Sequence, residues 1–229
     1  MIILPGSRIH SASIDLSAIR DNAAVLVRRA GSAVVVADVR ADAYGHGLAA
    51  VSDAAVDGGV FVRDIDSSAS AGLHADFVSA GTALYGLSAD PELRPAMRVS
   101  ALVVGTKSID IGESVSYGYT WTASSRTNLA LVGIGYADGL GRIASNVGSL
   151  FLGGAPRRIR GRVAMNALVL DLGHYSAAVG DEAVVFGDPA AGEPAVWDWA
   201  ASIGSASAEI VSVFGSHLPR VYCCQPVCR

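Results

Sequence analysis

The chain has 229 residues, of which 51% are hydrophobic and 17% charged, with a formal net charge of −4. This composition is typical of a globular protein with a large buried fraction, and the chain is long enough for one large domain or two modest ones. It offers no clustered basic patch for a nucleic-acid partner, no apolar run near the roughly 18 residues of a membrane span, and no secretory signal, so we expect a cytoplasmic protein without nucleic-acid or membrane partners.

The first part of the chain predicts alternating strands and helices. Ser17 is the predicted N-cap of the first helix, and the apolar run at 34–39 predicts a strand buried on both faces. This order implies parallel βαβ units. The predicted elements are a strand at 9–16, a helix at 17–29 ended by Gly31, a strand at 34–39, a helix at 48–56 and a strand at 60–65.

After about Pro95 the pattern changes to short alternating runs separated by turn residues, which predicts antiparallel β structure. The predicted strands lie at 99–105, 129–134, 149–152, 163–170 and 182–186, and short helices follow at 197–203 and 207–214. We therefore predict two domains, residues 1–92 and residues 93–229.

Three cysteines, Cys223, Cys224 and Cys228, lie in the last seven residues. They could form a Cys-x3-Cys metal clip or remain reduced thiols. No histidine follows to complete a tetrahedral set, and an odd number argues against a closed disulfide framework. His46 has no second histidine nearby, so we expect no metal site.

Several motifs of the sequence match one family in order along the chain. They are Val39-Arg-Ala-Asp-Ala-Tyr-Gly-His-Gly47, Ser67-Ser-Ala-Ser70, Phe77 to Ser88, Gly133-Ile-Gly-Tyr-Ala-Asp-Gly-Leu-Gly-Arg142, Gly161-Arg-Val-Ala-Met-Asn166 and Leu218-Pro-Arg-Val-Tyr222. In these stretches the chain resembles the alanine racemases, in which the second position of the first stretch is lysine.

The resemblance implies a (β/α)8 barrel followed by a β domain, in a dimer whose active sites are shared between subunits. A complete barrel needs about 250 residues, and only about 90 precede the β domain here. We therefore expect an α/β plus β fold, in which a truncated barrel remnant precedes a mostly antiparallel β domain. Either the remaining strands form a small open sheet or another chain covers the exposed edges, and a homodimer with shared sites is expected.

The lysine of the family's pattern forms an imine with pyridoxal phosphate. Here that position is Arg40, and a guanidinium cannot form this imine. Lys107 is the only lysine of the chain. Two further departures point the same way: Ser79 replaces an arginine facing the pyridine ring, and Ala208 replaces a tyrosine near the phosphate.

Other positions match the family's functional residues. Tyr136 matches an acid/base tyrosine, and Met165 matches a residue whose backbone N–H meets the substrate carboxylate, although Asn166 stands where the family has aspartate. The remaining matches are to residues that contact the cofactor phosphate: Tyr44, Ser68, Gly81 and Thr82.

Each of the two central residues has a second interpretation. Tyr136 could move protons or could simply pack at a glycine-rich turn. Arg40 could bind an anion at a strand end, where α/β folds place their sites, or could be an ion-pair partner for Asp38 or Asp42.

From these residues we predict a cofactor-independent acid/base enzyme of the isomerase or cyclase type, acting on a small metabolite of specialised metabolism. Arg40 would hold or polarise the ligand and Tyr136 would transfer the proton. The alternatives are a non-catalytic binding or scaffold homologue, and a residual pyridoxal-phosphate-dependent alanine racemase.

Overall fold

The structure is a computed structural model that describes residues 8–63 and 77–224. The predicted site residue Ser68, the end of the strand predicted at 60–65 and Cys228 lie outside these ranges. The described residues form two compact units. The first, here called the β unit, comprises 8–12, Arg98–Ser205 and His217–Pro219, and the second, the α/β unit, comprises 13–63, 77–97, Ala206–Ser216 and 220–224. The boundary predicted at residues 92 and 93 stays a prediction.

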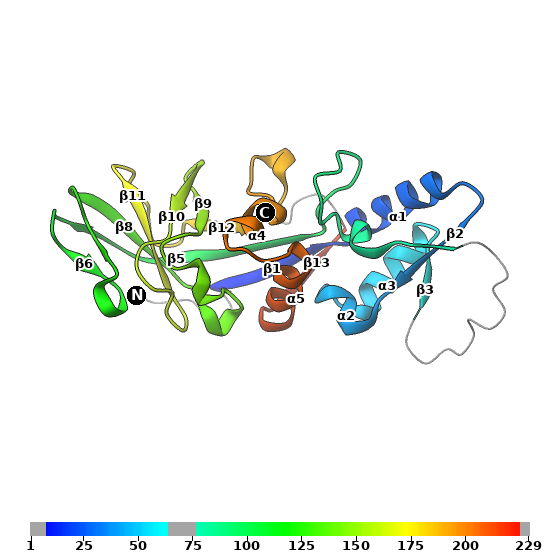
Figure 1. Ribbon diagram of the computed structural model, residues 1–229, viewed down its shortest axis with the longest axis horizontal. Coiled ribbons are helices and arrows are strands. Elements are labelled where there is room, and N and C mark those ends of the chain that lie inside the picture. The colour runs from blue at the N-terminus through cyan, green and yellow to red at the C-terminus, as the bar shows by residue number, and fades with distance from the viewer. Residues whose placement is uncertain (1–7, 64–76, 225–229) are drawn as a thin grey trace. The chain divides into compact units, whose positions relative to one another are not determined.

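The α/β unit contains a small parallel sheet in the order β3-β2-β4. β2 pairs in parallel with β3 on one side and with β4 on the other, which confirms the predicted parallel βαβ unit for β2, α3 and β3. The first predicted strand, β1, does not join this sheet but belongs to the eight-stranded sheet, so the predicted unit of 9–16, 17–29 and 34–39 is wrong. Helices α1 and α3 pack against each other and against this sheet (Figure 1). β1 (His10–Asp15) begins in the β unit and ends in the α/β unit. The elements that follow it are α1 (Leu16–Ala30), β2 (Val34–Asp38), α3 (Leu48–Asp57), β3 (Phe61–Arg63) and β4 (Phe77–Ser79).

The central strand β2 is buried on one face only. Val35 and Ala37 are buried, whereas Val34 and Val36 between them are half-buried. The prediction of a strand buried on both faces is therefore wrong. A barrel covers its strands inside as well as outside, whereas the described residues of this three-stranded remnant bury only the face of β2 that carries Val35 and Ala37. Its edge strands consequently leave apolar side chains exposed, Phe61 by 64% and Phe77 by 63%.

Helix α1 begins one residue earlier than predicted because Asp15 caps it. The Asp15 carboxylate accepts from the backbone N–H groups of Ser17 at 2.8 Å and Ala18 at 3.2 Å. Its backbone is extended, as an N-cap requires. Ser17, the predicted cap, lies inside the first turn and donates its hydroxyl to the same carboxylate. Gly31 ends the helix as predicted, with φ of +63°.

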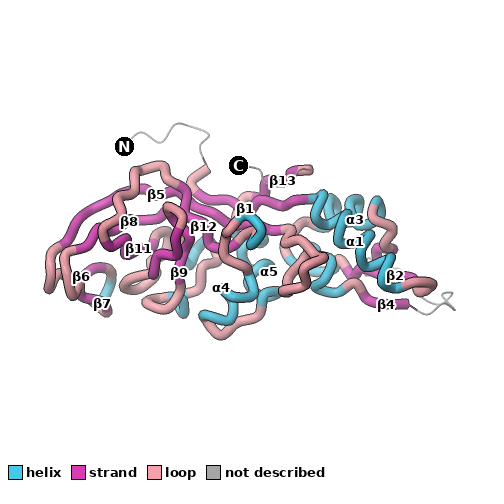
Figure 2. Tube along the Cα trace, turned by 90° about the horizontal axis from the view of Figure 1, so that it is seen from above, coloured by secondary structure: helices cyan, strands magenta, loops and turns pink. Residues whose placement is uncertain are grey.

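The β unit consists mainly of strands, which are magenta in Figure 2, and they pair antiparallel as predicted. The long strand β5 organises it, because its first half pairs with β12 and its second half with β8. Three short strands, β6, β7 and β10, were not predicted. The strands are β5 (Met97–Ile109), β6 (Ser114–Val115), β7 (Trp121–Thr122), β8 (Thr127–Val132), β9 (Ser149–Leu152), β10 (Ala155–Arg158), β11 (Leu168–Gly173) and β12 (Glu182–Phe186).

The late helices α4 (Val196–Ser202) and α5 (Ser207–His217) lie where short helices were predicted, and β13 (Arg220–Cys223) follows them. α5, up to Ser216, and β13 belong to the α/β unit, although the β unit separates them from it in the sequence. Across the described ranges, no helix combines the length and the apolar character that crossing a bilayer requires.

Candidate functional site

The turn that follows β2, Arg40–Tyr44 (α2), has an unusual backbone. Four successive residues that are not glycine have left-handed φ values: Ala41 (52°), Asp42 (57°), Ala43 (54°) and Tyr44 (54°). Each such residue costs roughly 1–2 kcal/mol. Strain of this kind persists only where surrounding contacts hold it, and it clusters at functional sites.

Asp42 makes the contacts that hold this turn. Its carboxylate accepts from the backbone N–H of Leu48 at 2.8 Å, at the start of α3, and forms an ion pair with Arg220 of β13. The guanidinium of Arg220 also donates to the carbonyl of Gly45 at 3.3 Å. The turn is thus tied both to the next helix and to the last strand of the unit.

Arg40 forms an ion pair with Asp38 at the end of β2. Its Nε lies 2.8 Å from each carboxylate oxygen, and its Nη2 also bonds Oδ2. The guanidinium holds the pKa of Asp38 below its usual range. Of the two interpretations of Arg40, the ion pair is present in the structure, and anion binding stays a prediction. Because the arginine side chain is 58% exposed, the pair contributes little to stability.

A buried aromatic cluster lies beneath the turn and includes a residue that the sequence did not single out. The Tyr85 ring meets Tyr44 edge-on, with centroids 5.3 Å apart, and His46, with centroids 4.6 Å apart. Within the described part of the chain, neither the Tyr85 hydroxyl nor His46 Nε2 has a hydrogen-bond partner. Burial raises the pKa of Tyr85. The sequence signal that could have indicated this residue is a tyrosine directly before Gly86, the glycine that ends the Gly81–Tyr85 turn.

His46 should make the α/β unit less stable in mild acid. Burial lowers its pKa from 6.5 to about 4. Between these values the unfolded chain binds a proton that the folded chain does not, so stability falls as pH falls from 6.5 towards 4, by up to about 3 kcal/mol. Urea unfolding at a series of pH values should show this loss, and His46→Phe should flatten it. An unchanged slope in the variant would contradict the assignment.

The predicted phosphate contacts Gly81 and Thr82 begin the short 3-10 turn η2 (Gly81–Tyr85). Both are exposed. Gly81 has φ of +51°, and none of the described residues lies within 4 Å of where its Cβ would be. Tyr44 shares this neighbourhood, because it contacts Tyr85 at the end of the same turn. Phosphate binding by these residues stays a prediction.

Tyr136 lies in the β unit, in a turn that backbone hydrogen bonds fix to the Met165 loop. Its N–H donates to the Ala164 carbonyl at 3.0 Å, and the N–H of Ala137 donates to the Met165 carbonyl at 2.9 Å. A Cβ at Gly135 would come within 2.3 Å of the Ala164 oxygen, so only glycine allows this close approach.

The structure therefore brings three predicted site residues together. The Tyr136 side chain is 42% exposed, Met165 is 55% exposed, and Asn166 is exposed as well. The guanidinium carbon of Arg142 lies 6.0 Å from the centre of the Tyr136 ring, close enough for a weak cation–π attraction. Arg40 belongs to the other unit, and its pairing with Tyr136 stays a prediction.

His10 and Asp138 hold the turn that bears Tyr136 through hydrogen bonds to its backbone and to Gly133. The sequence analysis gave neither residue a role at the site. His10 Nδ1 donates to the Gly133 carbonyl at 2.8 Å, and Nε2 lies 3.6 Å from Asp138 Oδ1. The other oxygen of Asp138 accepts from the Gly135 N–H at 2.8 Å. Gly135 and Asp138 are buried, whereas Tyr136 and Ala137 are exposed, so the Tyr136 ring is the functional group of the turn that faces solvent.

Comparison with known families gives two overlapping matches. The family described as "Alanine racemase, C-terminal domain" matches residues 96–222, and "Alanine racemase, N-terminal domain" matches residues 14–130. The alanine racemase of Salinispora tropica is 47% identical over 154 residues, which cover 65% of this chain and 41% of that protein. That of Streptomyces coelicolor is 43% identical over 157 residues, with 65% and 40% covered. The chain thus spans about two-fifths of the length of these curated relatives.

Solved structures agree with the fold. The alanine racemase from Streptomyces coelicolor A3(2) is similar with a TM-score of 0.83 and 25% identity, covering 93% of this chain and 97% of that one. The alanine racemase from Bartonella henselae, solved with covalently bound pyridoxal phosphate, has a TM-score of 0.83 and 17% identity, with 95% and 100% covered. The predicted α/β plus β fold, with a truncated barrel remnant, is confirmed.

Proposed function

The chain belongs to the alanine racemase family, and we propose that it takes part in the pyridoxal-phosphate-dependent racemisation of alanine. The observation that carries the proposal is the identity of 43–47% to proteins named alanine racemase. The turn that bears Tyr136 and the loop that bears Met165 supply matching geometry, because they are held together by backbone hydrogen bonds.

Three predictions from the sequence are corrected by these relatives. A cofactor-independent isomerase or cyclase is wrong, and so are the absence of a cofactor and the scaffold alternative, because the similar proteins are named as alanine racemases and one solved relative holds pyridoxal phosphate covalently. The departures at Arg40, Ser79 and Ala208 stand beside an identity of 43–47% over 154–157 residues, and this identity supports the activity of the relatives.

Residue 40 nevertheless does not fit a covalent link to the cofactor. The guanidinium of Arg40 has no free amine lone pair for an imine, and Asp38 already binds it. Lys107, the only lysine of the chain, lies on β5 of the β unit. We therefore propose that a lysine-bearing racemase chain supplies the amine.

In this proposal the chain contributes the tyrosine half of a shared site. Family dimers, as the resemblance implies, build each site from two subunits, so a subunit with an arginine at position 40 can still offer its tyrosine to a partner. The phenol of Tyr136 would give or take the proton at the substrate carbon, and the loop at Met165 and Asn166 would meet the substrate carboxylate. Two copies of this chain would form the homodimer predicted above. Exchange of subunits with the lysine-bearing racemase would then give the mixed dimer.

The test is complementation in a mixed dimer. A full-length alanine racemase whose catalytic tyrosine is replaced by phenylalanine is co-expressed with this chain under a different tag, and alanine racemisation is measured on doubly purified material. We expect activity at least about a hundred-fold above that of the phenylalanine variant alone.

Two outcomes would overturn parts of the proposal separately. Racemisation by this chain alone with added pyridoxal phosphate would support the reaction and reject the partner lysine. A mixed dimer without restored activity, or no mixed dimer and no activity of the chain alone, would reject the contribution of Tyr136 to alanine racemisation.

A further inference from the structure

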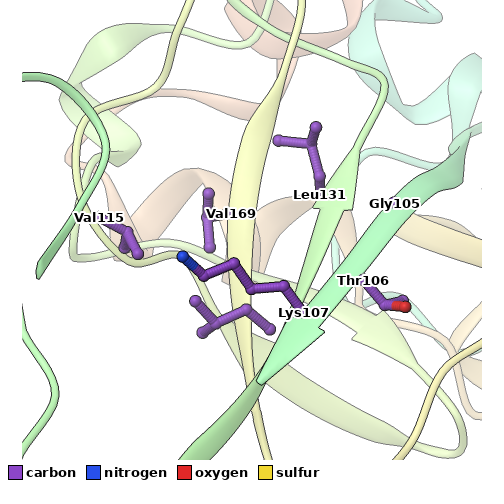
Figure 3. A pocket seen from close by; sticks show the side chains of 7 residues that line it. Gly105, Thr106, Lys107, Val115, Leu131 and Val169 are labelled. Atoms are coloured by element: carbon purple, nitrogen blue, oxygen red, sulfur yellow. The ribbon is translucent and has the colours of Figure 1, made fainter. Parts of the chain in front are cut away.

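The β unit contains a pocket whose lining includes none of the predicted site residues. It is formed over the β5, β8 and β11 face and beside β6, and it has a volume of about 250 Å³ (Figure 3). The residues that line it are Gly105, Thr106, Lys107, Val115, Leu129, Leu131 and Val169.

The pocket wall is almost entirely apolar. Leu129 is 4% exposed and belongs to a small core with Ile109 and Ala123, against which Val115 and Val169 also pack. Leu131, on the same strand as Leu129, is 41% exposed at the rim. Water gains few hydrogen bonds against such a surface, so covering it with an apolar group is favourable.

One charged group accompanies this apolar wall. The Lys107 side chain extends along the pocket, and its nitrogen lies on the side where Val115 and Val169 are (Figure 3). In the described part of the chain no carboxylate lies within ion-pair distance of it, whereas the arginines nearby in sequence, Arg98 and Arg126, have acidic partners. Its aliphatic stem covers apolar surface while the ammonium remains available.

Gly105 leaves space at the β5 side of the pocket. A Cβ at this position would have only the Leu131 Cβ within 4 Å, at 3.9 Å. Its φ is not in the left-handed region, so the backbone does not require glycine here. A larger side chain could therefore fill the space without straining the strand.

We propose that this pocket binds a small monocarboxylate with a compact apolar tail. The tail would lie on Leu129, Leu131 and Val169, and the carboxylate would pair with the ammonium of Lys107. Apolar pockets with a few polar groups that fix orientation are the usual form of small-molecule sites, and those for drug-sized ligands begin near about 300 Å³, so the ligand here is smaller. The site is independent of the proposed racemase function.

Hexanoate is a suitable probe, and its binding to the complete chain can be followed by calorimetry and by amide chemical shifts. Acetate lacks the tail and hexylammonium reverses the charge, so both should bind more weakly. Lys107→Met keeps the aliphatic stem and removes the charge, and it should weaken hexanoate by about five-fold. Gly105→Leu should fill the pocket and weaken hexanoate by at least about ten-fold.

Thermal unfolding of both variants provides the folding control, because each side chain is compatible with the strand. Equal binding of hexanoate and hexylammonium, or unchanged binding by both variants, would overturn the proposal. It would also be overturned if no shift were seen with hexanoate while Gly105→Leu changed the oligomeric mass, because the face would then be covered by another protein chain.

Discussion

Replacement of Tyr136 by phenylalanine should lower alanine racemisation in the mixed dimer by about a hundred-fold or more, since that is the usual cost of removing a positioned acid or base. The substitution removes only the hydroxyl. The ring is 42% exposed, and the turn is held by backbone hydrogen bonds to Ala164 and Met165 that phenylalanine preserves. Steady-state racemisation rates in both directions, D to L and L to D, are the measurement.

The matched control is Tyr117→Phe. Tyr117 is a tyrosine of the same unit, 71% exposed, and the proposal gives it no role, so its replacement should leave both rates unchanged. Equal dimer yields for the two variants would exclude an effect on assembly. Full activity of Tyr136→Phe would remove the tyrosine from the reaction.

Gly215→Ala should destabilise the α/β unit, although alanine favours helices over glycine by about 1 kcal/mol. A Cβ at Gly215 in α5 would come within 2.0 Å of the Gly45 carbonyl oxygen. That atom belongs to the backbone after the left-handed turn and cannot move without disturbing Asp42 and its partners. We expect a net loss of about 1–3 kcal/mol, the usual cost of overpacking, measured by urea unfolding.

Ser216→Ala, one residue later on the same helix, gives the comparison. Ser216 is exposed and donates its hydroxyl only to the Ser212 carbonyl of the same helix. Its replacement should change stability by no more than about 0.5 kcal/mol. If Gly215→Ala were as stable as this variant, α5 and Gly45 would not be in the close contact described.

Local sequence patterns predicted much of the fold because they depend on nearby residues. The strands at 149–152 and 182–186 have the predicted bounds, since turn residues flank both of them. Very short strands were harder to predict. The β6–β7 hairpin has only two residues in each strand, too few to show an alternating pattern.

Only part of the site could be predicted, because some of its features depend on contacts between residues far apart in the sequence. Motif matching found Tyr136 and Met165, and the structure brings their loops together. It could not find the left-handed turn, because Ala41, Asp42 and Ala43 give no glycine signal and the turn depends on Arg220, 178 residues away from Asp42. Tyr85 was missed because its importance lies in its contacts with Tyr44 and His46, and these arise only on folding.

The membership of α5 and β13 in the α/β unit has a consequence for synthesis on the ribosome. Residues 13–97 emerge first, yet their partners Arg220 and Gly215 emerge only after the whole of Arg98–Ser205. The β unit is nearly continuous in sequence, so it can complete its hydrogen bonding before α5 and β13, the last elements of the α/β unit, have been synthesised. Although domains nearer the N-terminus generally fold first during translation, in this chain the order should be reversed, and the nascent parallel sheet would remain open to chaperones for most of elongation.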